Sequence, residues 1–132
     1  MTDISQQMSD IAKEFADCRA VFTAMGDENR QLIILALLEN YGGMRVGEIT
    51  KKTNLSRPAV SHHLKVLKEA GIVDMFEIGT MNFYHMSGEE QHWNRFSLLL
   101  HHLESIMSDI KAVETCENMK GKGSLEWKSE KR

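Results

Sequence analysis

Several residue types and patterns are scarce in this chain of 132 residues, and each scarcity excludes a class of protein. The only two cysteines, Cys18 and Cys116, form no CxxC pair, so we expect neither a disulfide framework nor a structural zinc module. No apolar run approaches the roughly 20 residues that cross a bilayer. Residues 1–10 lack the basic patch and apolar stretch of a signal peptide. We therefore expect a cytoplasmic protein with no membrane partner.

The chain also lacks an overall excess of basic residues, since its net charge is −3. The charge is unevenly distributed, however. Residues 51–70 contain five basic side chains and one acid, whereas residues 88–118 contain six acids and two bases, so the segments carry +4 and −4. A local basic patch is what a phosphate backbone requires, and the global charge matters less.

Arrangements typical of enzymes are missing as well. No nucleophile–base pair, phosphate-binding loop or carboxylate pair stands out. Apolar residues make up 42% of the chain and charged residues 27%, as in an ordinary globular domain. We therefore expect a protein that is not an enzyme and needs no cofactor.

Apolar residues recur with helical spacing near both ends of the chain. Steps of three and four residues predict a helix over residues 2–24, ended by Gly26, and a long helix opened by a capping box at Ser87 and Glu90. A heptad pattern sustained over about three heptads favours a partner helix. The two stripes are formed by Met8, Ile11, Phe15, Cys18, Phe22 and Met25, and by Phe96, Leu99, Leu103, Ile106, Ile110 and Val113.

Between these helices the pattern predicts three shorter helices and a hairpin. Asp27 caps a helix whose segment 32–38 is almost wholly apolar, so we expect it to be surrounded by protein. A short extended piece at 44–46 precedes a helix over 46–53. After a tight turn at Asn54 and Leu55, Ser56 caps a helix that ends near residue 70. Residues 72–78 and 80–86 change to the composition of strands, with Gly79 between them.

The two helices within residues 46–70 form a helix-turn-helix candidate. With Val60, Leu64 and Leu67 turned inward, the second helix presents a short polar face without acids, which suits the major groove of DNA. The outward residues are Arg57, Pro58, Ser61, His62 and Lys65. Lys51 and Lys52 on the preceding helix are candidates for phosphate contacts, as is the helix N-terminus at Ser56.

Three segments resemble the ArsR/SmtB family of winged-helix repressors. Residues 25–30, followed by the apolar residues 32–35, look like the family's LxxPxRxxIL opening, and residues 55–73 look strongly like its recognition helix. Residues 79–84 look like the wing, although its tip carries no charge. The resemblance covers residues 20–86 at the level of motifs.

The resemblance implies a mainly α fold with a small β-hairpin wing, a winged helix-turn-helix that dimerises through its first and last helices. It implies a homodimeric repressor that binds double-stranded DNA at a near-palindromic operator and is released by an inducer. The expected DNA contacts are Lys51, Lys52, Ser56, Arg57, Pro58, Ser61, His62, His63, Lys65, Thr80 and Asn82. The expected dimer interface comprises Ile11, Phe15, Cys18, Phe22, Phe96, Leu99, Leu103, Ile106, Ile110 and Val113. We expect this domain to span residues 1–118, followed by a flexible polar tail over 119–132.

The sequence supports other sites and functions less strongly than it supports a DNA-binding repressor. The family's metal site on the last helix pairs an acid and a histidine with a second histidine eleven residues on. Glu90 and His92 match its first half, but the residue eleven after His92 is Leu103, so no metal site is expected. A redox switch through Cys18 and Cys116 remains open, although Cys18 falls on an apolar stripe. A winged-helix protein-interaction module that does not bind DNA is the other alternative.

Overall fold

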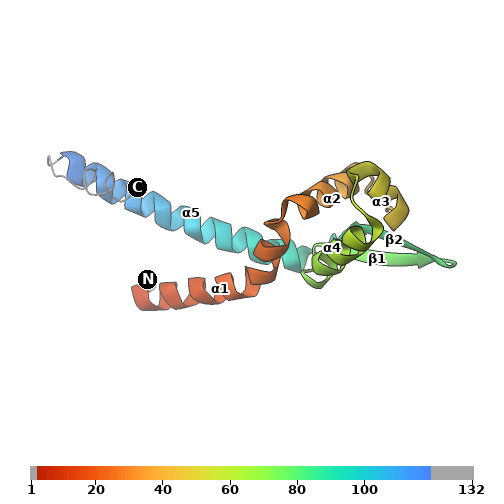
Figure 1. Cartoon of the computed structure of the whole chain (residues 1–132). Helices are drawn as coiled ribbons and strands as arrows, with labels where there is room; N and C mark the ends of the chain where they lie inside the picture. The colour runs from red at the N-terminus through yellow and green to blue at the C-terminus, as the bar shows by residue number, and fades with distance from the viewer. Residues whose placement is uncertain (1–2, 120–132) are drawn as a thin grey trace. The chain divides into compact units, whose positions relative to one another are not determined.

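The computed structural model describes residues 3–119, which fall into two compact units, residues 1–96 and residues 97–132. In the first unit four helices are followed by a β-hairpin (Figure 1). The helices are α1 (Ile4–Met25), α2 (Glu28–Glu39), α3 (Val46–Thr53) and α4 (Arg57–Glu69), and the strands are β1 (Val73–Ile78) and β2 (Met81–Met86). The last helix, α5 (Glu90–Met119), begins in the first unit and forms the described part of the second. No helix in residues 3–119 is long and apolar enough to cross a membrane.

The core of the first unit lies where α2, α3, α4 and the hairpin meet. Ile33, Leu37, Ile49 and Leu67 are fully buried there, together with Val60 and Leu64 from the recognition-helix candidate. The inward face predicted for α4 is therefore confirmed, and its outward face is free to contact a partner.

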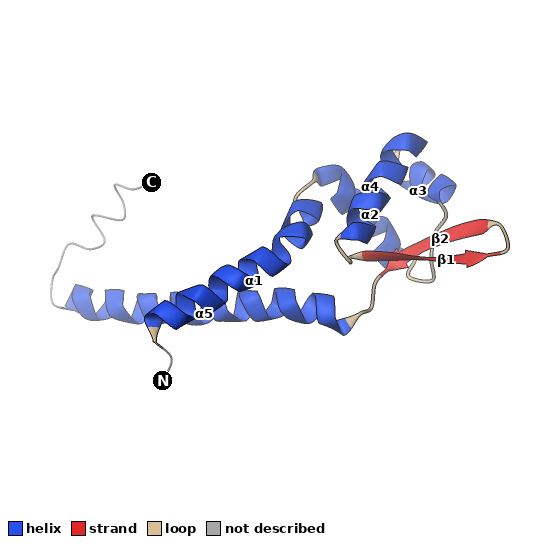
Figure 2. Ribbon diagram, turned by 90° about the horizontal axis from the view of Figure 1, so that it is seen from below, coloured by secondary structure: helices blue, strands red, loops and turns tan. Residues whose placement is uncertain are grey.

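The hairpin is the wing that the sequence predicts. Strands β1 and β2 pair antiparallel with Ile78 opposite Met81, around the two-residue turn Gly79–Thr80 (Figure 2). Gly79 has φ +62°, which a residue without Cβ adopts without strain. Met44 adds one antiparallel bridge to Tyr84, with backbone N–H···O distances of 2.9 and 2.8 Å. The short extended piece predicted at 44–46 thus attaches the start of α3 to the wing.

The expectation that α2 is surrounded by protein is wrong for one side of the helix. Ile33 and Leu37 are fully buried, but Leu32, Leu35 and Leu38 are 41%, 57% and 55% exposed in the described chain. Residues spaced by three lie on one face of a helix, so these leucines form an apolar stripe at the surface. Composition revealed that the segment is apolar, but not that only half of it faces the core.

The capping box predicted at Ser87 and Glu90 is also wrong, because α5 begins at Glu90 itself. Ser87 instead accepts a hydrogen bond from the N–H of Glu89 at 3.4 Å, and its carbonyl accepts one from the Trp93 ring N–H at 2.8 Å. The flexible tail was predicted over residues 119–132. Residue 119 belongs to α5, and residues 120–132 lie outside the described part of the chain.

Candidate nucleic-acid interface

The N-terminus of α4 is held by local interactions that the sequence encodes. Asn54 takes a left-handed conformation, φ 62° and ψ 18°, and so turns the chain between α3 and α4. The Ser56 hydroxyl oxygen then accepts a hydrogen bond from the N–H of Ala59 at 3.3 Å, and Pro58 stands in the first turn, where no N–H is needed. The end of α4 that carries Arg57 is thereby fixed next to α3.

The outward face of α4 is polar and lacks acids until Glu69 near its end. Ser61, His62 and Lys65 are exposed on it, and Arg57 and Pro58 are exposed at its start. Hydroxyl, imidazole and amine groups are suited to the acceptors and donors of base edges and to phosphates. The structure thus brings together the five residues assigned to this face.

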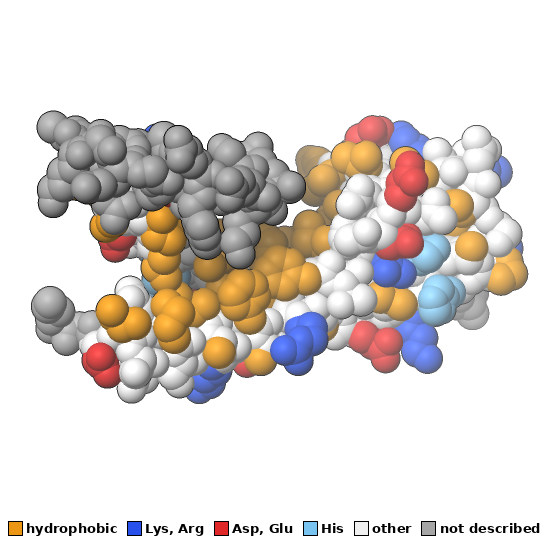
Figure 3. All heavy atoms as spheres, turned by 60° about the vertical axis from the view of Figure 1, so that its left-hand side comes forward, with side chains coloured by type: hydrophobic (Ala, Val, Ile, Leu, Met, Phe, Trp, Pro, Cys, Tyr) orange, Lys and Arg blue, Asp and Glu red, His pale blue; other side chains and the backbone are white. Residues whose placement is uncertain are grey.

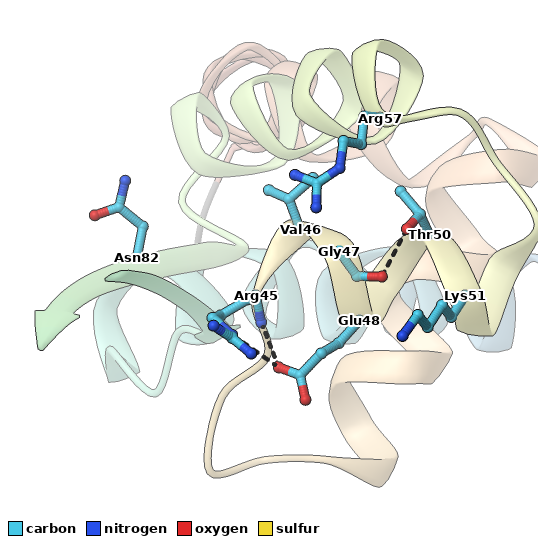
Figure 4. A pocket seen from close by; sticks show the side chains of 8 residues that line it. All are labelled: Arg45, Val46, Gly47, Glu48, Thr50, Lys51, Arg57 and Asn82. Carbon is cyan, nitrogen blue, oxygen red and sulfur yellow. Dashed lines mark hydrogen bonds and ion pairs between the residues drawn. The ribbon is translucent and has the colours of Figure 1, made fainter. Parts of the chain in front are cut away.

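A groove of about 570 Å³ adjoins the start of α4. Figure 4 shows the side chains around it, which come from Arg45 and the helix α3 that follows it, from Arg57 of α4 and from Asn82 of the wing. Its lining carries three cations, Arg45, Lys51 and Arg57, against the single carboxylate of Glu48. A concave surface with excess positive charge beside a donor-rich helix has the electrostatic character of a phosphate-binding surface.

Gly47 allows Arg57 to lie over the first turn of α3. A Cβ at position 47 would come within 2.8 Å of the Arg57 Nη2 atom. The Thr50 hydroxyl donates to the Gly47 carbonyl at 2.6 Å, so the polar groups of this turn are partly satisfied within the helix. Gly47 therefore contributes to the groove by leaving space for the guanidinium group.

Arg45 also lies in the groove, although it is not among the DNA contacts expected from the sequence. The backbone N–H of Arg45 donates to Oε1 of Glu48 at 2.9 Å, and its side-chain Nε lies 3.8 Å from that same oxygen. Its Nη1 lies 3.0 Å from the sulfur of Met81 in the wing. The spacing of Arg45 and Glu48 marks only the start of α3, and no local signal in the sequence places Arg45 in a groove with Arg57 and Asn82.

The two lysines of α3 have different surroundings. Lys51 lines the groove, whereas the Lys52 amine lies 2.6 Å from the Glu39 carboxylate of α2. Neighbouring helical residues diverge by about 100°, so only one of the two can face the groove. Of the wing residues, Asn82 lines the groove and Thr80 is exposed in the hairpin turn.

His63 differs from the other expected DNA contacts because its ring is half-buried. Its Nδ1 atom lies 3.2 Å from Nη1 of Arg30 on α2. Burial lowers the pKa of His63, as do the neighbouring charges of Arg30 and His62, while the Asp27 carboxylate acts in the opposite direction. The neutral ring is therefore favoured, and its partner inside the protein is Arg30.

Comparison with known proteins identifies the family. Residues 27–75 match the model of the bacterial regulatory proteins of the arsR family, a range that includes α2, the helix-turn-helix and the start of the wing. An HTH-type transcriptional regulator of Methanocaldococcus jannaschii is 39% identical over 74 residues, which cover 56% of this chain and 82% of that protein. The chain belongs to the ArsR family.

Other relatives agree with this assignment. The transcriptional repressor SdpR of Bacillus subtilis is 37% identical over 67 residues, which cover 51% of this chain and 72% of that protein. The structure of reduced HlyU from Vibrio cholerae matches with TM-score 0.55 at 32% identity, over 71% of this chain and 95% of that one. An ArsR-like regulator from Rhodococcus, at TM-score 0.67 and 21% identity over 85% of this chain and 98% of that one, confirms the fold. This ArsR-family chain is thus a DNA-binding transcriptional regulator with a winged helix-turn-helix fold, in a family of regulators rather than enzymes.

The apolar stripe of α1 is partly exposed. Ile11 and Cys18 are buried, but Phe15 and Phe22 are 42% and 38% exposed, and apolar side chains gather along one side of the helix (Figure 3). Phe22 contacts Phe96 edge to face, with ring centroids 5.3 Å apart. In α5, Leu99 is buried, Leu103 and Ile106 are half-buried, and Ile110 and Val113 are 39% and 58% exposed.

The cysteines and histidines outside α4 do not assemble into a site among residues 3–119. Cys18 is buried, and burial raises the pKa of its thiol, as do the charges of Asp17 and Glu14. A raised pKa lowers the thiolate fraction, which disfavours a role in redox chemistry. His92 contacts the Glu89 carboxylate at 3.0 Å, and the described residues contain no group of three or more metal-ligating side chains.

Proposed function

We propose that this ArsR-family regulator is a homodimeric repressor that acts in the cytoplasm on a near-palindromic operator, and that an inducer releases it by changing the dimer geometry. The observation that carries the proposal is the acid-free outward face of α4 beside a groove lined by three cations. SdpR, a relative with 37% identity, is named a repressor, and repression is proposed by analogy with it, although HlyU, a relative with 31% identity, is named an activator.

The residues divide into two roles on the DNA. Ser61, His62 and Lys65 occupy the exposed middle of α4, where the recognition helix of a helix-turn-helix meets base edges. Arg57 and Lys51 face the groove and are suited to phosphates, and the capped N-terminus at Ser56 adds backbone N–H groups. Asn82 of the wing also lines the groove, and the peripheral contacts are Lys52, which is paired with Glu39, and Pro58, His63 and Thr80.

Dimerisation would occur within residues 1–118 through α1 and α5. Large apolar side chains such as Phe15, Phe22, Ile110 and Val113 remain exposed in the single chain. Monomeric proteins rarely expose large contiguous apolar patches. A dimer gives DNA recognition a two-fold axis, so two recognition helices would meet half-sites about one helical turn apart.

The test measures binding to the chain's own upstream promoter DNA and to scrambled DNA over a range of salt concentrations. We expect specific binding to the promoter DNA. The logarithm of the binding constant should fall linearly with the logarithm of the salt concentration. Arg57→Gln and Lys51→Gln should each weaken binding and reduce the slope by about one, as expected for loss of one phosphate contact. Lys52→Gln is the matched control and should have a smaller effect, because its amine is paired with Glu39.

Ser61→Ala tests base recognition separately. It should weaken binding to the operator more than to scrambled DNA and leave the salt slope unchanged, since a base contact carries sequence information. Equal binding of the wild type to promoter and scrambled DNA at all salt concentrations would contradict a repressor of that promoter. It would favour the alternative of a protein-interaction module, which the uncharged wing tip with Ile78 56% exposed would suit.

A further inference from the structure

Arg30, in the first turn of α2, joins α2 to both α1 and α4. Its Nε donates to the carbonyl of Ala24 at 2.8 Å, and its Nη2 donates to the carbonyl of Thr23 at 3.2 Å. Its Nη1 lies 3.2 Å from Nδ1 of His63 in the recognition helix. One guanidinium group therefore connects the C-terminal end of α1 to the helix that carries the DNA-binding face.

The two carbonyl contacts supply what α1 itself lacks. The last turn of a helix leaves carbonyl groups without helical partners and forms the negative end of the helix dipole. The last turn of α1 contains no basic residue. Arg30 of the neighbouring helix α2 supplies both missing elements, because its guanidinium group brings a positive charge to the last turn of α1 and donates hydrogen bonds to two of its carbonyl groups.

The contact with His63 determines where the ring proton lies. A guanidinium group only donates hydrogen bonds, so the Nδ1 atom of His63 must accept. The proton of the neutral ring is then on Nε2, for which the described part of the chain provides no hydrogen-bond partner. The half-buried ring thus keeps one N–H donor available to an acceptor from outside the protein.

We propose that Arg30 is a positioning residue for DNA recognition, which fixes α4 on the end of α1 and holds His63 in the neutral form with its proton on Nε2. The proposal rests on the proposed function. Because α1 carries part of the expected dimer interface, the link also sets the position of each recognition helix relative to the two-fold axis. Protonation of His63 would remove the acceptor and place a second cation beside the guanidinium group.

The charged groups around His63 are consistent with this role. The charges of Asp27, Arg30 and His62 all influence the pKa of the His63 ring. The Asp27 carboxylate accepts a hydrogen bond from the backbone N–H of Arg30 at 3.0 Å. The Asp27 cap thereby fixes the first turn of α2, from which the Arg30 side chain extends.

The first experiment measures operator affinity and its salt dependence for Arg30→Gln. We expect about tenfold weaker binding, as for the loss of a hydrogen bond to a charged group, with an unchanged salt slope because Arg30 holds α4 rather than a phosphate. Arg57→Gln, which should reduce the slope by about one, is the matched control. An unchanged affinity, or a slope reduced by about one, would overturn the positioning role.

The second experiment needs no DNA, so it separates failure of this inference from failure of the proposed function. Nitrogen-15 NMR of the histidine rings in the wild type at pH 7.5 should show His63 protonated on Nε2, and Arg30→Gln should give a mixture of tautomers. If Arg30→Gln does not fold, Arg30→Met, which keeps a long side chain but has no N–H donor, serves instead. A wild-type His63 ring protonated on Nδ1 overturns the proposal, whatever the promoter binding.

Discussion

His62 and His63 are neighbours on α4, but their side chains have different surroundings. His62 is exposed on the outward face, whereas His63 is half-buried against Arg30. The helical wheel separates them by about 100°, and the sequence placed His62 but not His63 on the outward face of α4, although both were among the expected DNA contacts. The partner of His63 was not predictable, because Arg30 lies 33 positions away in the chain.

The pH dependence of stability should reflect His63. The pKa of His63 is lowered in the folded state, chiefly by burial. Around and below pH 6.5, the ordinary pKa of histidine, the unfolded chain therefore binds more protons at this residue than the folded chain does. The stabilising contribution of the neutral ring is complete above pH 6.5 and is lost as the pH falls from there through the lower folded-state pKa. Thermal unfolding between pH 7.5 and 5.5 should therefore show a smaller decrease in Tm for His63→Asn than for the wild type. His62→Asn is the control and should behave like the wild type; equal decreases in all three proteins would contradict the assignment.

At the scale of elements, α2 illustrates what hydrophobic composition leaves open. Ile33 and Leu37 have no exposed surface, while Leu35 on the opposite side is 57% exposed. An apolar run without a polar face gives no periodicity from which the buried side can be chosen. The wing and α3 were easier to predict, because glycine, asparagine and capping residues mark their ends locally.

Truncation of leucines in α2 should separate the two sides of this helix. Leu37→Ala should lower the free energy of unfolding by about 2–5 kcal/mol, the usual cost of a cavity in a packed core. Leu35→Ala is the matched control on the same helix and should cost less than about 1 kcal/mol. Urea unfolding monitored by circular dichroism measures both. A Leu35→Ala cost similar to that of Leu37→Ala would mean that the exposed stripe is covered in solution.

At the scale of the whole molecule, the expected homodimer depends on apolar residues that the single chain leaves exposed. Ile110 and Val113 of α5 are 39% and 58% exposed, and the heptad spacing places them on one side of the helix. A glutamate in the middle of an apolar interface would be buried without a partner charge. The interface should therefore fail when one of these positions is charged.

Ile110→Glu should shift the protein from dimer to monomer in size-exclusion chromatography with light scattering. It should also weaken operator binding at least tenfold, because one monomer meets only one half-site. Ser105→Glu is the matched control, since its helical position is on the other side of α5 from the stripe and it is exposed. A monomeric wild type, or an Ile110→Glu variant that remains dimeric, would contradict an interface built on α5.

The sequence by itself determined the order of the elements, the ends marked by Asp27, Asn54, Ser56 and Gly79, and the outward face of α4. These features depend on caps, turns and periodicity within a few residues, which a single sequence contains. Only the tertiary structure decided that Arg30 holds His63, that Arg45 and Lys51 share a groove with Arg57, and that Lys52 faces Glu39. These contacts join separate elements, and their partners follow from how the helices pack around a common core rather than from any local pattern.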